Sequence, residues 1–63
     1  MSKEEISCDS LKNGDLFSQS STGESVLEFV GHDHQWIDCI YKGKHGDKMI
    51  KVYPHNRRVY KIN

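Results

Sequence analysis

The chain has 63 residues and equal numbers of basic and acidic side chains, nine of each, so its formal net charge is zero. A chain of this length is one domain at most and buries only about 60% of the surface of its unfolded form, which argues against a large catalytic cleft. It has no apolar run long enough to cross a membrane, and its first residues are charged where a signal peptide would turn apolar. We therefore expect a soluble, cytoplasmic protein without a membrane partner.

The charges are distributed unevenly along the chain. Through Trp36 there are two Lys and seven Asp or Glu, a net charge of −5, whereas the remaining residues carry seven Lys or Arg and two Asp, a net charge of +5. This asymmetry is compatible with a basic patch for an anionic partner, and equally with salt bridges between the two halves. Cys8 and Cys39 are expected to be reduced thiols rather than a disulfide.

The N-terminal residues 1–10 are expected to form a short arm ahead of the domain at residues 11–63. Ser2 and Glu5 fit a helix-capping pattern, which allows one helical turn, but no apolar helical stripe follows it. The Asn13-Gly14 pair then predicts a tight turn, because both residue types tolerate positive φ.

Short β-rich runs separated by turn signals fill the rest of the sequence. The expected strands are residues 16–19, 26–30, 36–42, 49–53 and 58–62. Five short strands without a substantial helix predict an all-β fold, a small five-stranded antiparallel barrel whose closure would protect the strand edges. Alternation along the strands predicts a core made of Leu27, Phe29, Ile37, Cys39, Ile50, Val52 and Val59, with Phe17 and Tyr41 also packed inside.

From Trp36 onward, the order of motifs resembles the C-terminal half of SH3 domains. A tryptophan opens one strand, a turn with glycines and a second strand follow, and Pro54-His55-Asn56 precedes a short last strand that contains Val59. In that family the Pro-x-Asn segment forms a 3₁₀ turn that joins the last two strands. The resemblance implies the same joint here, an SH3-like barrel of the broad type that also includes Tudor, KOW and Sm-like modules, and a ligand surface at Trp36 and Pro54. Arg57 stands where the family has a tyrosine.

The C-terminal half mixes cations with aromatic residues, as nucleic-acid grooves do, where cations neutralise phosphates and aromatic rings stack on bases. The candidates for binding nucleic acid or another partner are Trp36, Lys42, Lys44, Lys51, Tyr53, Arg57, Arg58 and Tyr60. The alternative structural role is a solvated sheet face in which charged residues protect an edge from aggregation.

The sequence favours neither metal binding nor catalysis. His32, His34, Cys39 and His45 carry metal-ligating atoms, but their spacing lacks the tight pairs of small zinc domains, so exposed loop histidines are favoured and no metal or other cofactor is expected. No nucleophile signature, phosphate loop or carboxylate pair supports catalysis or a small-molecule substrate. The sequence thus predicts a non-enzymatic module that binds nucleic acid through its basic, aromatic C-terminal face. The alternative is a protein-interaction or regulatory module, of the kind that bacterial or phage accessory proteins supply to a larger complex, docking through Trp36 and nearby tyrosines.

Overall fold

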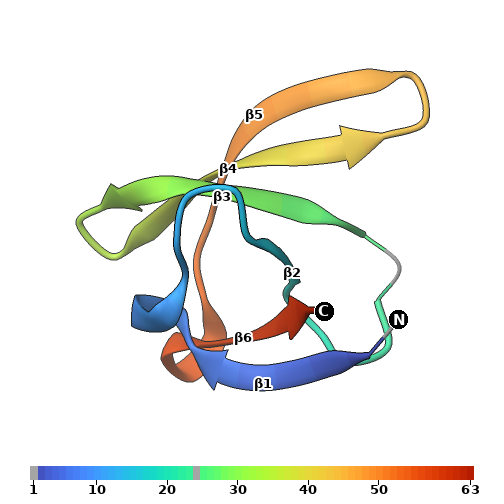
Figure 1. Cartoon of the computed structure of the whole chain (residues 1–63). Helices are drawn as coiled ribbons and strands as arrows, with labels where there is room; N and C mark the ends of the chain where they lie inside the picture. Colours follow the sequence, from blue (N-terminus) through green and yellow to red (C-terminus); the bar gives the residue numbers. More distant parts are fainter. Residues whose placement is uncertain (1, 24) are drawn as a thin grey trace.

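A computed structural model describes residues 2–23 and 25–63, and within these ranges the protein is all-β (Figure 1). The elements in chain order are β1 (Lys3–Ser7), the 3₁₀ turn η1 (Cys8–Ser10), β2 (Leu16–Ser18), β3 (Leu27–Asp33), β4 (Trp36–Gly43), β5 (Gly46–Val52), the 3₁₀ turn η2 (His55–Arg57) and β6 (Arg58–Ile62). The strand at residues 58–62 has the predicted bounds, and the others differ from prediction by up to three residues at an end. The expected count of five strands is wrong, because β1 is a sixth.

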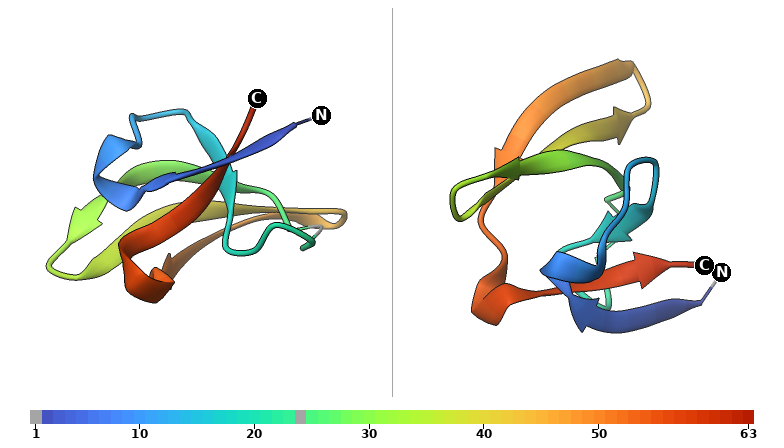
Figure 2. Two further views of the ribbon diagram at one scale, coloured as in Figure 1. Left: turned by 90° about the horizontal axis from the view of Figure 1, so that it is seen from below. Right: turned by 60° about the vertical axis from the view of Figure 1, so that its left-hand side comes forward.

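All strands belong to one antiparallel sheet in the order β1-β6-β2-β3-β4-β5. Figures 1 and 2 show β3, β4 and β5 as one layer that lies across β1 and β6, with β2 between them. The sheet curves strongly but stays open, so the closed barrel expected from the sequence is not what forms. Its two end strands, β1 and β5, are not paired with each other within the described residues.

The first ten residues are part of the sheet and not an arm. β1 pairs with β6 from Lys3 opposite Ile62 to Ser7 opposite Arg58, and Ile6 packs against the core. The helix-capping pattern at Ser2 and Glu5 is overridden, because a ladder to the far end of the chain satisfies the backbone groups that a helical turn would have used. The short helical segment that does form here, η1, follows β1 and is capped by the Ser7 hydroxyl.

The core is close to the one expected from alternation. Among the described residues, nine apolar side chains are buried: Cys8, Leu11, Phe17, Leu27, Phe29, Ile37, Cys39, Val52 and Val59. Ile50 is partly buried, and both cysteines are free thiols. The expectation that Tyr41 packs inside is wrong, since this residue is 37% exposed. Its β4–β5 hairpin extends past the opposite layer, so no strand covers the inner side of its tip (Figure 1).

Two turns set the geometry around the sheet. The predicted turn at Asn13-Gly14 is confirmed, with a φ of 92° at Gly14 and a hydrogen bond from Asp15 N to Lys12 O. The connection between β5 and β6 is η2, so the segment that begins at Pro54 is a 3₁₀ joint between the last two strands, as expected. Asn56 and Arg57 within it both have positive φ, which turns the chain sharply into β6.

A β-bulge in β3 changes which way its last residues face. Phe29 is opposite Cys39, but Gly31 is opposite Asp38, so Val30 is an extra residue in the ladder. Beyond a bulge the alternation shifts by one. His32, opposite the buried Ile37, therefore lies on the inner side together with Phe29, and the two rings are 5.2 Å apart in an edge-to-face arrangement.

Candidate functional site

The structure distributes the eight predicted site residues over separate parts of the surface. Trp36, Lys51 and Tyr53 lie together at one end of the β4–β5 pair, and Lys42 lies farther along the same outer face. Lys44 is in the hairpin turn between β4 and β5, and Arg57 is in η2. Arg58 and Tyr60 lie two positions apart on β6. The Tyr60 hydroxyl donates to Glu5 Oε2 at 3.4 Å.

Trp36 and Tyr53 form an exposed aromatic pair. Trp36 opens β4 and Tyr53 follows β5, and the pairing of Ile37 with Val52 places them next to each other. Their ring centroids are 5.6 Å apart with an interplanar angle of 76°, an edge-to-face geometry. The exposed fractions are 44% for Trp36 and 53% for Tyr53. Two large rings are therefore fixed against each other while both remain open to a partner.

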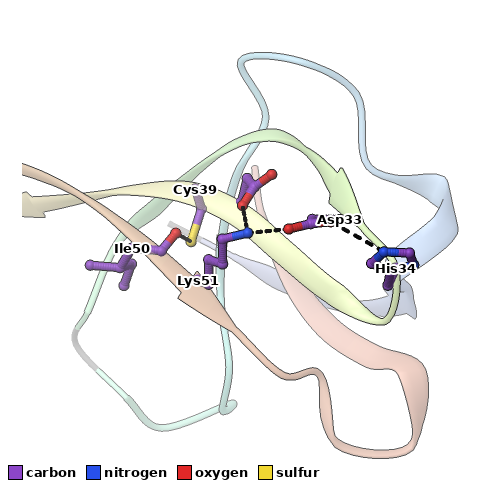
Figure 3. Close-up of polar contacts among 6 residues, drawn as sticks. Asp33, His34, Cys39, Ile50 and Lys51 are labelled. Atoms are coloured by element: carbon purple, nitrogen blue, oxygen red, sulfur yellow. Dashed lines mark hydrogen bonds and ion pairs between the residues drawn. The ribbon is translucent and has the colours of Figure 1, made fainter.

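Lys51 is held between two carboxylates on the outer face of the sheet (Figure 3). Its Nζ donates a hydrogen bond to Asp33 and lies 3.4 Å from Asp38 Oδ1. The hydrogen bond to Asp33 raises the pKa of Lys51 and lowers the pKa of Asp33. The positive charge at this position is thus already matched within the protein.

Lys42, farther along the same outer face, also lies between two carboxylates. Its Nζ lies 3.0 Å from Glu28 Oε1 and 3.2 Å from Asp47 Oδ2, and the bond to Glu28 is the main cause of its raised pKa. Together the two lysines contact four carboxylates, so this part of the outer face carries more negative than positive charge.

Arg57 forms an ion pair that connects the two 3₁₀ turns. Its guanidinium donates to Asp9 Oδ2 at 2.6 Å, a contact between η2 and the middle residue of η1. The hydrogen bond raises the pKa of Arg57 and lowers the pKa of Asp9. Three of the predicted cations, Lys42, Lys51 and Arg57, therefore have carboxylate partners.

A cavity of about 270 Å³ lies beside this ion pair and brings together three segments distant in sequence. Its lining comes from η1, from the end of β3 and the turn after it, and from the connection between β5 and β6: Cys8, Asp9, His32, His34, Gln35, Tyr53, Pro54 and Arg57. Tyr53 belongs both to the cavity and to the aromatic pair, so the two form one continuous site, which we call the aromatic cavity.

Part of the aromatic cavity could be predicted from the sequence. Trp36, Tyr53 and Arg57 were predicted from composition, and the SH3 resemblance pointed to Trp36 and Pro54. Cys8 and Asp9 were missed because they were assigned to an arm. His32 was considered only as a metal ligand, and no sequence signal marked the bulge that turns it inward.

The cavity lining includes the thiol of Cys8. Burial raises the pKa of the Cys8 thiol, and the neighbouring Asp9 raises it further. A thiol kept protonated is a weak nucleophile. Within residues 2–23 and 25–63, no cluster of three or more His, Cys, Asp or Glu side chains could hold a metal ion.

The tip of the β4–β5 hairpin forms a second, more open hollow. It is lined by Tyr41, Lys44, His45 and Lys48 together with the two glycines of the turn. Tyr41 is directly opposite Lys48 in the ladder, so an exposed aromatic residue and a lysine are neighbours here.

The chain was compared with protein-family models, curated proteins and solved structures, and none of the three comparisons finds a match. No helix in the described part of the chain combines the length and hydropathy needed to cross a membrane. What the fold and the site define is a small all-β protein with an aromatic cavity built from both ends and the middle of the chain.

Proposed function

We propose that this protein is a non-enzymatic binding module with an SH3-like topology. The strand order β6-β2-β3-β4-β5, with a 3₁₀ turn between β5 and β6, supports the SH3-like arrangement. In this view β1 is an additional strand that lengthens the sheet beyond β6. Fold alone does not assign a function, so the proposal for the ligand rests on the site.

The proposed ligand is a short segment of a partner protein, bound in the aromatic cavity. The observation that carries this proposal is the exposed Trp36–Tyr53 pair at the edge of the cavity. Trp and Tyr are favoured interface anchors because they bury a large area at a low cost in conformational entropy. The cavity volume of about 270 Å³ is in keeping with one or two inserted side chains.

The ion pairs explain why a protein segment is favoured over nucleic acid at this site. Lys51, two positions before Tyr53, and Arg57, which lines the cavity with Tyr53, are both engaged by carboxylates. A phosphate backbone approaching them would face Asp33, Asp38 and Asp9. Nucleic-acid binding depends on unmatched cations that release counterions from phosphates.

The test is selection of peptides from a displayed random-sequence library on the wild-type protein, with removal of peptides that also bind the Trp36→Ala variant. A synthetic peptide from the selected pool is then titrated into ¹⁵N-labelled protein. We expect saturable shifts at Trp36, Tyr53 and the residues around η2, and affinity at least about 30-fold weaker for Trp36→Ala, because a central aromatic anchor contributes about 2 kcal/mol or more.

Tyr60→Ala is the matched control, since Tyr60 is an aromatic residue on β6 that does not line the aromatic cavity. It should bind the selected peptide as wild type does. If no peptide is enriched over the Trp36→Ala variant, or if Tyr60→Ala weakens binding as much as Trp36→Ala, the aromatic cavity is not the site.

A second candidate function, nucleic-acid binding, is favoured only at the hairpin tip. There Tyr41 lies beside Lys48 and Lys44 is close by, and within the described residues no ion pair engages either lysine. Single-stranded oligonucleotides at low and moderate salt test it by fluorescence anisotropy. Binding that falls steeply with salt and is lost in a Lys44→Glu, Lys48→Glu double variant would support this candidate, and a flat response at low salt would remove it.

A further inference from the structure

β5 offers a free strand edge to a partner. It ends the strand order, and Figures 1 and 2 show no other part of the chain along its outer side. Met49, at its centre, is 64% exposed. This is the largest exposed fraction of any large apolar residue in the described part of the chain. An unpaired edge presents a row of backbone donors and acceptors that can pair with a strand from another chain.

We propose that two copies of this chain pair antiparallel through β5, about a two-fold axis at Met49. In this register Met49 lies opposite the partner's Met49, and Asp47 lies opposite the partner's Lys51. The symmetric contact is Lys51 opposite the partner's Asp47. The two three-stranded layers β3-β4-β5 then join into one continuous six-stranded layer. A two-fold pairing of this kind uses one surface twice and closes on itself.

Charge selects this register over its neighbours. Residues opposite each other in an antiparallel ladder point to the same side of the sheet. The outer faces of the two copies therefore remain on one side of the joined layer only in registers that differ by two residues. A shift in one direction places Lys48 opposite the partner's Lys48. A shift in the other direction places Lys51 opposite the partner's Met49 and leaves Asp47 without a lysine opposite. The register centred on Met49 is the one of these three that matches both charges.

The proposed contact would also join two ion-pair groups already formed within each chain. Asp38 contacts Lys51 in one group, and Asp47 contacts Lys42 in the other, which continues to Glu28. Across the interface, Lys51 of one copy would meet the partner's Asp47. The result is an alternating row of charges, from Asp38 of one subunit to the partner's Glu28, on the outer face of the joined layer (Figure 3 shows the Lys51 end).

This interface is separate from the proposed ligand site. None of the residues that line the aromatic cavity belongs to β5. Failure of the dimer and failure of peptide binding are therefore distinguishable results.

Sedimentation equilibrium over a wide range of protein concentration, to about 1 mM, tests the pairing with two charge variants. Asp47→Lys would place Lys opposite Lys, and Lys51→Asp would place Asp opposite Asp, so each variant should self-associate at least about tenfold more weakly than wild type. In an equimolar mixture the two variants would again present opposite charges at both contacts. The mixture should therefore recover dimers that neither variant forms alone. Circular dichroism of each variant checks that both are folded.

The proposal is overturned if the wild type stays monomeric throughout, if neither substitution weakens its dimer, or if the mixture recovers nothing. A Met49→Cys variant gives an independent readout, since residues opposite each other across an antiparallel pair are close enough for a disulfide. Mild oxidation should yield a covalent dimer of this variant. The control Lys12→Cys, at an exposed position outside β5, should yield far less; equal yields would contradict the register.

Discussion

Asp9 and Arg57, 48 positions apart in the sequence, are joined by a hydrogen-bonded ion pair of 2.6 Å between Asp9 Oδ2 and the Arg57 guanidinium. The pair connects η1, near the start of the chain, to η2, near its end, and both residues line the aromatic cavity. The edge of the proposed ligand site is thus held by a contact that forms only when the whole chain is folded.

The first prediction concerns this pair and pH. The pKa of Asp9 is lowered from its ordinary value of 3.8 by the bond to Arg57, so the pair stabilises the fold above pH about 4. That stabilisation is lost as the pH falls through the lower pKa of the folded state. Urea unfolding from pH 5 to pH 2 should therefore show a smaller loss of stability for Asp9→Asn than for wild type.

Arg57→Gln is the matched control, because it removes the same pair from the other side. It should reduce the pH dependence as Asp9→Asn does, and the double variant should add nothing further. A pH dependence equal to that of wild type in both single variants would show that the ion pair does not persist in solution.

The second prediction uses Trp36, the one tryptophan of the chain, as a reporter. Tyr53 covers one side of its indole ring. Tyr53→Ala should increase the exposure of the indole to water and shift its fluorescence emission to longer wavelength. Tyr60→Ala should leave the emission unchanged, since Tyr60 contacts Glu5 on another strand. Equal spectra for wild type and Tyr53→Ala would mean that the two rings do not stay together.

The third prediction concerns the two thiols. Cys8 is 3% exposed and Cys39 is not exposed at all, and burial raises the pKa of both. Because the thiolate is the reactive form, both should react slowly with a disulfide reagent at pH 7 and rapidly in urea. A peptide bound in the aromatic cavity should slow Cys8 further and leave Cys39 unchanged. Rapid labelling of the native protein at both sites would contradict the burial.

The fourth prediction compares two neighbouring residues of β2. Phe17 is completely buried, whereas Leu16 is 37% exposed. Phe17→Ala should cost about 3–5 kcal/mol in the free energy of unfolding, which is a large share of the stability of so small a domain. Leu16→Ala should cost about 1 kcal/mol or less. Chemical denaturation measures both, and similar losses would indicate that β2 is not oriented as described.

Much of the secondary structure could be predicted from local chemistry. Asn13-Gly14 and the segment that begins at Pro54 mark turns through the backbone conformations that these residues allow, and period-two alternation placed Ile37, Cys39 and Val52 in the core. These features depend on residues close in sequence, so the sequence contains the information directly.

The site was less predictable because it depends on contacts between distant segments. Tyr53 and Arg57 could be named, but not the cavity that they line together with Cys8 and His32, since it needs the pairing of β1 with β6 and the bulge at Val30. The electrostatics were decided in the same way. Lys42 and Lys51 look like free cations in the sequence, and the ladders that join β3, β4 and β5 place each of them beside carboxylates.

The sequence by itself therefore determined an all-β chain, the positions of its turns and most of its buried face, because these follow from backbone preferences and from the period of two along a strand. Only the tertiary structure decided that the N-terminal residues form a strand, that the sheet stays open at β1 and β5, and which charges remain unmatched. Those properties depend on the register between strands far apart in the chain, and register is fixed when the layers pack together.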